Sequence, residues 1–313
     1  MFEGVEDYPR ALLELERRFG TEQACREYLV ALRWPGGFIC PRCGARQAWP
    51  TNRGLWHCGQ CHHQTSVMAG TIFQDTHLPL MVWFRAIWQV TSQKTGASAL
   101  GVQRVLGLGS YKTAWTILHK LRRAMVRPGR ERLSGIIEVD ETYVGGPDQG
   151  ADGRGTEKPL VVVATQLDGK RIGRIRMCRV PDATGPSLLG FIADSIEPGS
   201  LIHTDGWESY KALPQKGYRH TVSKLRGKSG LAFQLLPHVH LVVSLLKRWL
   251  LGTLHGRVSP EHLDYYLDEF TFRFNRRTSA SRGKLFYRLL QQAVQVPPAP
   301  YREIILPPQV GDT

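Results

Sequence analysis

Four of the six cysteines form two closely spaced pairs, an arrangement that can hold a metal ion. The pairs are Cys40-Pro41-Arg42-Cys43 and Cys58-Gly59-Gln60-Cys61, separated by residues 44 to 57. Each Cys-x-x-Cys turn brings two thiolates together, and four thiolates make the tetrahedral ligand set of a structural zinc ion. The spacing therefore predicts a zinc ribbon with Cys40, Cys43, Cys58 and Cys61 as ligands. A disulfide or redox pair is the alternative interpretation of the same cysteines.

Three histidines lie beside these cysteines, at positions 57, 62 and 63. Because four thiolates already close the site, we expect the histidines to face solvent or DNA phosphate and the zinc to be structural. The other two cysteines, Cys25 and Cys178, stand alone in the sequence. We expect both to be small buried apolar residues.

Two aspartates could form a second metal site. Asp140 ends the apolar run 135–139, and Asp205 ends the run 200–204. If these runs are neighbouring strands, as the first and fourth strands of a ribonuclease H-like sheet are, the carboxylates meet and can bind hard divalent cations. Two such cations can activate the attacking oxygen and stabilise the leaving oxygen in phosphoryl transfer. The alternative is that each aspartate simply begins a turn.

The apolar pattern also predicts the elements that must position these aspartates. Two further strands are expected at 159–164 and 171–177. Residues 187–195 have helical spacing, so the fourth strand is expected to return parallel to its neighbour. Later helices are expected at 238–251 and at 259–275, where Ser259 is the N-cap and Pro260 the first helical residue.

The front of the chain reads as helical. Residues 8–34 form one amphipathic segment, and residues 78–125 read as three helices, interrupted at 95–96 and 107–109. Two helices joined by a glycine-containing turn are typical of a helix-turn-helix, whose second helix enters the DNA major groove. A helical hairpin with a tryptophan core is the alternative. The side chains expected to face DNA are Tyr111, Lys112, Trp115, His119 and Lys120, followed by the basic Arg122 and Arg123.

Composition favours a globular protein that binds a polyanion. The chain has 313 residues, 42% of them hydrophobic, and 41 Lys and Arg against 27 Asp and Glu give a net charge of +14. Such an excess of positive charge attracts nucleic acid. The N-terminal segment carries acids where a secretory signal would carry lysines, and no apolar run approaches the ~20 residues of a membrane span. We therefore expect a cytoplasmic, nucleoid-associated protein with no membrane partner.

Beyond these patterns, the sequence resembles a known family. Its motifs resemble those of DDE-superfamily insertion-sequence transposases with an N-terminal zinc ribbon, the ISXO-two-like group. The resemblance implies a catalytic domain that cuts and joins DNA at element ends, with Asp140 and Asp205 as the first two metal ligands. The motifs that carry it are Cys-Pro-Arg-Cys-Gly at 40–44 and the segments 66–73, 94–98, 137–146, 203–210, 246–253 and 270–277.

In that family the third ligand is an acid on a helix, with a Lys or Arg seven residues later. Here the resemblance makes Lys247 that basic residue and places His240 at the acid position. Seven residues are two helical turns, so both share a helix face. An imidazole suits Mn2+ or Zn2+ better than Mg2+, so His240 either shifts the metal preference or positions water or substrate. Lys247 would contact a phosphate, and Arg248, Arg273, Arg276 and Arg277 would extend the basic surface; Glu138, Glu261 and Glu269 are the fallback acids.

Together these inferences predict a multidomain α+β protein. Zinc-ribbon and helix-turn-helix-like regions precede a ribonuclease H-like α/β catalytic domain of the retroviral integrase superfamily with a mixed five-stranded sheet. The expected function is metal-dependent 3′-end cleavage and strand transfer on double-stranded DNA, with structural Zn2+, catalytic Mg2+ or Mn2+, and a homodimer or larger synaptic complex. A non-catalytic DNA-binding regulator or inactive relic and a structure-selective nuclease remain alternatives. The expected boundaries are 1–37 (helical segment), 38–70 (ribbon), 71–127 (helix-turn-helix-like region), 128–134 (linker), 135–295 (catalytic domain) and 296–313 (Pro-rich tail).

Overall fold

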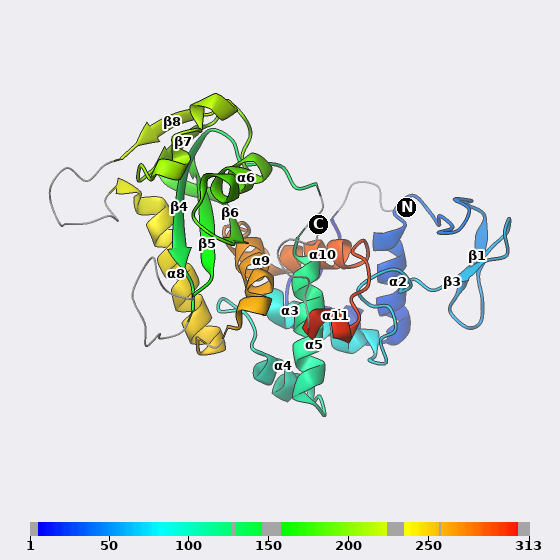
Figure 1. The fold of residues 1–313 in the computed structure, drawn as a ribbon. Helices are drawn as coiled ribbons and strands as arrows, with labels where there is room; N and C mark the ends of the chain where they lie inside the picture. Colours follow the sequence, from blue (N-terminus) through cyan, green and yellow to red (C-terminus); the bar gives the residue numbers. More distant parts are fainter. Residues whose placement is uncertain (1–5, 127–128, 146–157, 224–234, 257, 306–313) are drawn as a thin grey trace. The chain divides into compact units, whose positions relative to one another are not determined.

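The computed structural model describes residues 6–126, 129–145, 158–223, 235–256 and 258–305 (Figure 1). The chain divides into two compact units: one comprises Met1–Arg127 with Thr278–Ile305, and the other centres on Pro128–Arg277. Residues 278–295, assigned to the catalytic domain from the sequence, thus group with the front of the chain. Pro128 of the expected linker and residues 306–313 of the expected tail lie outside the described residues.

The first unit is a set of helices with a small sheet. Its front segment forms α1 (Leu12–Arg18) and α2 (Glu22–Arg33), and the side chain of Thr21 accepts a hydrogen bond from the N–H of Ala24 at the start of α2. The three helices expected between 78 and 125 are present as α3 (Leu80–Ser92), α4 (Ala99–Leu106) and α5 (Tyr111–Ala124). Two later helices, α10 (Arg282–Ala293) and α11 (Tyr301–Ile305), pack with them. The Pro-rich tail therefore contains a short helix, α11.

The turn between α4 and α5 has the geometry that its glycines predict. Gly107 ends α4 with φ +63°, a left-handed conformation that glycine adopts without steric cost. Ser98 caps the start of α4 by accepting a hydrogen bond from the N–H of Gly101. The glycine turn thus joins two helices at the position expected from the sequence.

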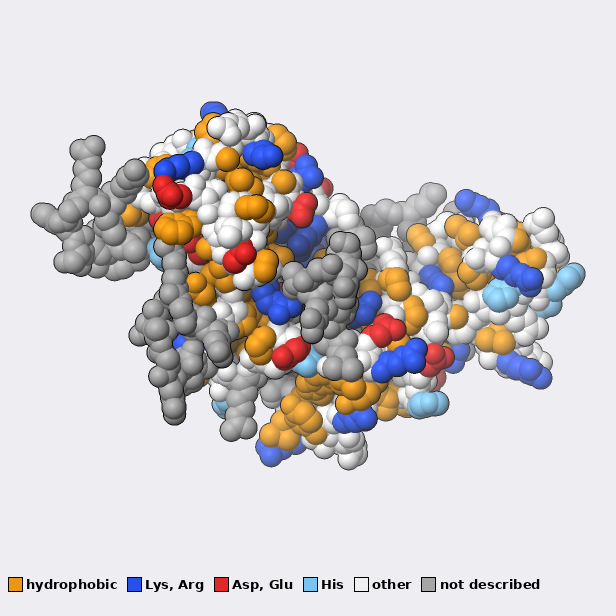
Figure 2. Space-filling view, viewed as in Figure 1, with side chains coloured by type: hydrophobic (Ala, Val, Ile, Leu, Met, Phe, Trp, Pro, Cys, Tyr) orange, Lys and Arg blue, Asp and Glu red, His pale blue; other side chains and the backbone are white. Residues whose placement is uncertain are grey.

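The zinc-ribbon region is a three-stranded antiparallel sheet with its own small core. It consists of β1 (Ala48–Pro50), β2 (Trp56–Cys58) and β3 (Gln64–Thr65), in that order. Phe38 stacks on Trp56 with ring centroids 5.5 Å apart, which covers one side of the cysteine turns. No Asp or Glu occurs between Glu27 and Asp75. Figure 2 shows Arg and His side chains on the exposed surface of this region.

The second unit is built on a mixed five-stranded sheet in the order β6-β5-β4-β7-β8. The antiparallel part contains β4 (Ile136–Tyr143), β5 (Leu160–Asp168) and β6 (Arg171–Val180), and β7 (Leu201–Thr204) and β8 (Arg219–Val222) continue it in parallel with β4. Helix α6 (Gly185–Ser195) makes the expected crossover before β7. This order and direction of strands is the ribonuclease H-like arrangement, and the expected fold class is confirmed.

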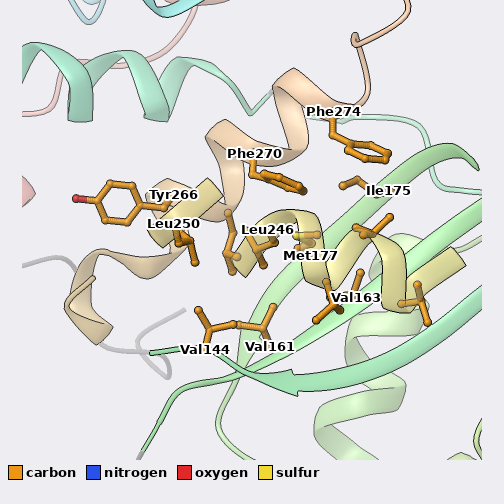
Figure 3. Close-up of a cluster of buried hydrophobic side chains, with 14 of the residues drawn as sticks. Val144, Val161, Val163, Ile175, Met177, Leu246, Leu250, Tyr266, Phe270 and Phe274 are labelled. Carbon is orange, nitrogen blue, oxygen red and sulfur yellow. The ribbon is translucent and has the colours of Figure 1, made fainter. Parts of the chain in front are cut away.

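Both faces of this sheet are covered by apolar side chains. Along β5, Val161 and Val163 face one core with α8 (Pro237–Leu254) and α9 (Leu263–Phe274), as Figure 3 shows. The alternate residues Leu160 and Val162 face a second core that includes residues of α6. In β4, Ile137 and Val139 also belong to the second core. Because side chains alternate along a strand, Glu138 and Asp140 point toward the α8 face.

Two details differ from the sequence-based expectations for this unit. Asp140 lies inside β4, which continues to Tyr143, rather than at the end of a strand. Cys178 is exposed, whereas Cys25 is fully buried as expected. Cys178 lies on β6, and β6 is an edge strand of the sheet. Within the described part of the chain, no helix has the length and apolar character needed to cross a membrane.

Candidate zinc centre and candidate active site

The four paired cysteines converge as a metal site requires. Their sulfur atoms all lie within 4.8 Å of one another. The distance from Cys40 Sγ to Cys61 Sγ is 3.6 Å, and that from Cys43 Sγ to Cys58 Sγ is also 3.6 Å. A tetrahedron with Zn–S bonds of ~2.3 Å has S–S edges of about 3.8 Å. The donor set and its size therefore fit zinc.

A backbone amide favours the thiolate form of Cys58. The N–H of Cys61 is the main cause that holds the pKa of Cys58 below its usual value. Hydrogen bonds to sulfur stabilise the thiolate, which is the form that binds metal. Outside the ligand set, His57 Nε2 lies 3.4 Å from His62 Nδ1, and the His57 ring stacks on Trp49. These two histidines thus contact each other at the ribbon surface.

In the second unit, sheet register brings the two aspartates to neighbouring positions. Strands β4 and β7 are parallel, with Ile136 opposite Leu201 and Glu138 opposite His203. Strand β7 ends at Thr204, so Asp205 follows the paired residues directly, and adjacent strands lie about 4.8 Å apart. The charge of Asp205 is among the causes that raise the pKa of Asp140, so the structure places these two carboxylates near each other.

The electrostatics of Asp140 reflect its burial and the negative charges beside it. The Asp140 side chain is 15% exposed. Burial, followed by the charges of Glu141, Asp205 and Glu138, raises its pKa to about 7. A carboxylate surrounded by like charges in a poorly hydrated site is stabilised by a bound cation. The donor set fits an oxygen-binding divalent ion.

The loop that carries Asp205 is held by several hydrogen bonds. Gly206 has φ +86°, which permits a tight turn directly after Asp205. The N–H of Trp207 donates to Asp205 Oδ1 at 2.9 Å. The Trp207 indole and the Ser209 hydroxyl both donate to the carbonyl of Ala183. The motif Asp-Gly-Trp-Glu-Ser-Tyr thus fixes the backbone at Asp205.

His240 also reaches this site. It lies in the first turn of α8, and its Nε2 is 3.6 Å from Asp140 Oδ2. Lys247 is exposed two turns later. Burial lowers the pKa of Lys247, and the neighbouring Lys158 lowers it further. The structure therefore places His240 beside Asp140. It places Lys247 near Lys158, which lies just before the start of β5.

Glu138 has a role that sequence reasoning missed. Its Oε2 accepts hydrogen bonds from the N–H groups of His238 (2.9 Å) and Val239 (2.8 Å), and its Oε1 lies 2.7 Å from His238 Nδ1. Both carboxylate oxygens are therefore engaged at the start of α8, which argues against Glu138 as a fallback ligand. The other fallback acids lie elsewhere: Glu261 is exposed in a short 3-10 helix, and Glu269 is buried in α9.

Some of the residues expected to contact DNA are not accessible. Arg122 is 2% exposed and His119 is fully buried, because both lie on the face of α5 that packs into the first unit. Neither side chain is therefore accessible to DNA in this structure. Lys112 is exposed and lies over the Tyr301 ring, whereas Lys120 and Arg123 are partly buried.

The arginines near the end of α9 make structural contacts. Arg276 donates to the carbonyl of Phe272 and stacks on its ring. Arg277 donates to carbonyls of Phe274, Gly173 and Ile172, so it joins the helix end to β6. Arg273 lies 3.9 Å from the buried Glu269. Arg248 is exposed on α8, and Arg277 is exposed as well.

Comparisons with known proteins agree with this picture. Residues 132–275 match the family model of the ISXO2-like transposase domain, and residues 20–64 match that of the transposase zinc-ribbon domain. The chain is also 26% identical over 281 residues to an uncharacterized protein in transposable element ISH50 of Halobacterium salinarum. That match covers 82% of this chain and 92% of the relative.

A solved structure is also similar, at a low level. It is a chain of the simian T-cell lymphotropic virus intasome in complex with PP2A regulatory subunit B56 gamma. The identity is 16%, the match covers 72% of this chain and 79% of that chain, and the TM-score is 0.31. A similarity of this size adds nothing to the strand order described above.

The fold, the cysteine cluster and the matched domains define the class of protein. The chain is an insertion-sequence transposase with a zinc ribbon ahead of a DDE-type domain. Within that class, both matched regions are those of the IS1595 family. The resemblance drawn from the sequence is thereby confirmed.

Proposed function

We propose that this transposase cleaves DNA at the 3′ ends of its own insertion element and joins those ends to target DNA. The observation that carries the proposal is the parallel pairing of β4 with β7, which places Asp205 near Asp140, with His240 3.6 Å from Asp140. The substrate is double-stranded DNA with the terminal inverted repeats of the element. Because two ends must be held together, the working form is a dimer or a larger assembly.

The reaction consists of two phosphoryl transfers at one site. Water attacks the phosphorus at the element end, the P–O3′ bond breaks, and the released 3′ oxygen takes a proton. That 3′-OH then loses its proton as it attacks a target phosphorus, and the bond from this phosphorus to its own 3′ oxygen breaks. Both steps develop negative charge on oxygen, which bound Mg2+ or Mn2+ would stabilise.

The residues of the chain have distinct parts in this proposal. Asp140 and Asp205 would hold the cations through carboxylate oxygens. His240 would either add a nitrogen ligand, which suits Mn2+ better than Mg2+, or orient the attacking oxygen. Lys247, whose neighbour Lys158 adds a second positive charge, and Arg248 would bind DNA phosphates. In the first unit, zinc on the four cysteines would stabilise the ribbon without taking part in the chemistry.

The test is cleavage of labelled terminal-repeat DNA by the purified chain with Mg2+ or Mn2+. Asp140→Ala and Asp205→Ala should abolish cleavage and joining while DNA binding persists. Asp194→Ala is the matched control, because Asp194 is an exposed aspartate on α6, which covers the other face of the sheet. Full activity of either site variant would refute the proposal. Cleavage without any joined product would instead indicate a structure-selective nuclease.

One observation favours a second candidate, a DNA-binding regulator that does not cut. His240 occupies the expected acid position, and both oxygens of Glu138 are engaged. Tight DNA binding by the wild-type chain with no strand cleavage in either metal would establish this alternative.

A further inference from the structure

The two glutamates that flank the metal-binding position of β4 each contact a different element. Glu138 and Glu141 lie two residues before and one residue after Asp140. Because side chains alternate along a strand, Glu138 points to the α8 face with Asp140, and Glu141 points to the opposite face. Strand β4 thus carries three carboxylates within four residues, and they do not all lie on the same face of the sheet.

Glu138 holds the start of α8. Helix α8 begins with Pro237, and no side chain within the helix caps its N-terminus. The first N–H groups of a helix lack partners within that helix. Glu138 Oε2 accepts two of them, from His238 and Val239, and Oε1 binds the His238 ring. The Glu138 side chain is 4% exposed, so these bonds are shielded from water.

This anchor determines where His240 lies. His240 follows the anchored residues directly in the first turn of α8, and Asp140 follows Glu138 by two positions on the same strand face. Two contacts between β4 and α8 therefore lie next to each other: Glu138 with His238, and Asp140 with His240, whose Oδ2 and Nε2 atoms are 3.6 Å apart. A shift of α8 along β4 that breaks the first contact would also move His240 away from Asp140.

Glu141 holds the loop of Asp205 from the other face. Its Oε2 accepts a 2.8 Å hydrogen bond from the hydroxyl of Tyr210. Tyr210 is fully buried and follows Asp205 by five residues. Burial and the Glu141 charge raise the pKa of Tyr210 well above its usual value, so the phenol stays protonated and donates. The bond ties the segment after β7 to β4 directly beside Asp140.

We propose that Glu138 and Glu141 are positioning residues for the metal site, Glu138 by fixing His240 through α8 and Glu141 by fixing Asp205 through Tyr210. The inference rests on the proposed function for its catalytic consequence. Its geometric content rests only on the hydrogen bonds described above. Neither glutamate is a ligand in this arrangement, although both are next to one.

Two isosteric variants of the full chain test the proposal. Glu138→Gln keeps the shape but replaces the charged acceptor, and Tyr210→Phe removes only the hydroxyl that Glu141 accepts. Tyr218→Phe is the matched control, because the buried Tyr218 hydroxyl donates to the Ile196 carbonyl away from the site. Amide hydrogen exchange and Mn2+ binding followed by electron paramagnetic resonance are measured on each protein, and Asp140→Ala identifies the Mn2+ that binds at this site.

The expected results are local and differ between the two variants. Glu138→Gln should speed exchange at the first turn of α8 by roughly tenfold, as expected for a weakened cap. Tyr210→Phe should speed exchange in the loop after Asp205. Each should weaken Mn2+ binding about 10- to 100-fold, the usual effect of removing a group that orients a ligand. The control should change neither measurement at the site.

The following outcomes would contradict the positioning role, the proposed function or both. Unchanged exchange in both variants, or faster exchange with unchanged Mn2+ affinity, would overturn the positioning role. A wild-type chain that binds no Mn2+ at Asp140 would overturn both this inference and the proposed function. If the wild type binds Mn2+ and the variants weaken it, but no DNA is cut, the positioning role stands and the proposed function fails.

Discussion

The imidazole of His240 lies with Nε2 3.6 Å from Oδ2 of Asp140, at the start of α8. The N-terminus of a helix carries a partial positive charge, which favours the negative charge of the acid cluster. At this helix position the family resemblance implies a carboxylate, and His240 has an imidazole, which carries no negative charge. The identity of this one side chain should therefore determine which divalent metal the site prefers.

We expect His240→Glu to shift the metal preference from Mn2+ toward Mg2+. A carboxylate supplies the oxygen donor that Mg2+ prefers, whereas an imidazole suits softer ions. His240→Ala should raise the metal concentration needed for half-maximal cleavage by about 10- to 100-fold. The measurement is the ratio of cleavage rates in Mg2+ and Mn2+ across a concentration series. The same ratio in all three proteins would show that His240 does not contact the metal.

The raised pKa of Asp140 predicts a stability effect with a definite sign. Burial, Glu141 and Asp205 raise this pKa from 3.8 to about 7 in the folded chain. Between these pH values the folded state holds a proton that the unfolded state has lost, so stability falls as the pH rises through this window. The cost of keeping Asp140 ionised is on the order of a few kcal/mol above pH 7.

Asp140→Asn removes this cost, so the variant should be more stable than the wild type at pH 8. The gain should shrink toward pH 5, where folded Asp140 is already neutral. Urea unfolding in buffer without Mg2+ or Mn2+ measures both proteins. A gain of equal size at both pH values would mean that packing rather than ionisation is responsible.

Much of the second unit could be predicted because its strands are buried on both faces. Apolar runs at 136–139, 160–164 and 201–202 left a clear pattern, and the crossover helix fixed the direction of β7. Strand β8 was not found, because Arg219–Val222 is short and mostly exposed. The proximity of Asp140 and Asp205 could be predicted from strand order, because parallel pairing of β4 with β7 brings residues that are distant in sequence close together.

The missed and wrong assignments depend on contacts that are distant in sequence. Glu138 meets His238 one hundred residues later, and nothing in the local pattern indicates that contact. Arg122 read as part of a basic run, but the buried face of α5 is wide enough to include it. A charged side chain is seldom buried, so sequence alone favours exposure. Periodicity therefore identifies elements more reliably than it identifies which polar groups meet between them.

Zinc binding is predicted to depend on each ribbon cysteine. Cys40→Ser should lose stoichiometric zinc and lower the thermal stability of the first unit, because metal binding contributes folding free energy to such small sites. Cys178→Ser is the control, since Cys178 is exposed and lies outside the ribbon. Elemental analysis and thermal unfolding measure the two effects. Retention of one zinc per chain in Cys40→Ser would contradict a four-cysteine site.

The accessibility of the two basic residues on α5 leads to opposite predictions for their variants. Lys112 is exposed in the first turn of α5, whereas Arg122 is buried near its end. If α5 enters the major groove, Lys112→Ala should weaken DNA binding and reduce the slope of log K against log salt by about 1. Arg122→Ala should instead destabilise the first unit, because it leaves a gap in a packed face, while the salt slope of the folded protein stays the same. Binding measured over a series of salt concentrations, with thermal unfolding in parallel, separates the two effects. A reduced slope for Arg122→Ala, or an unchanged slope for Lys112→Ala, would show that a different face of this helix meets DNA.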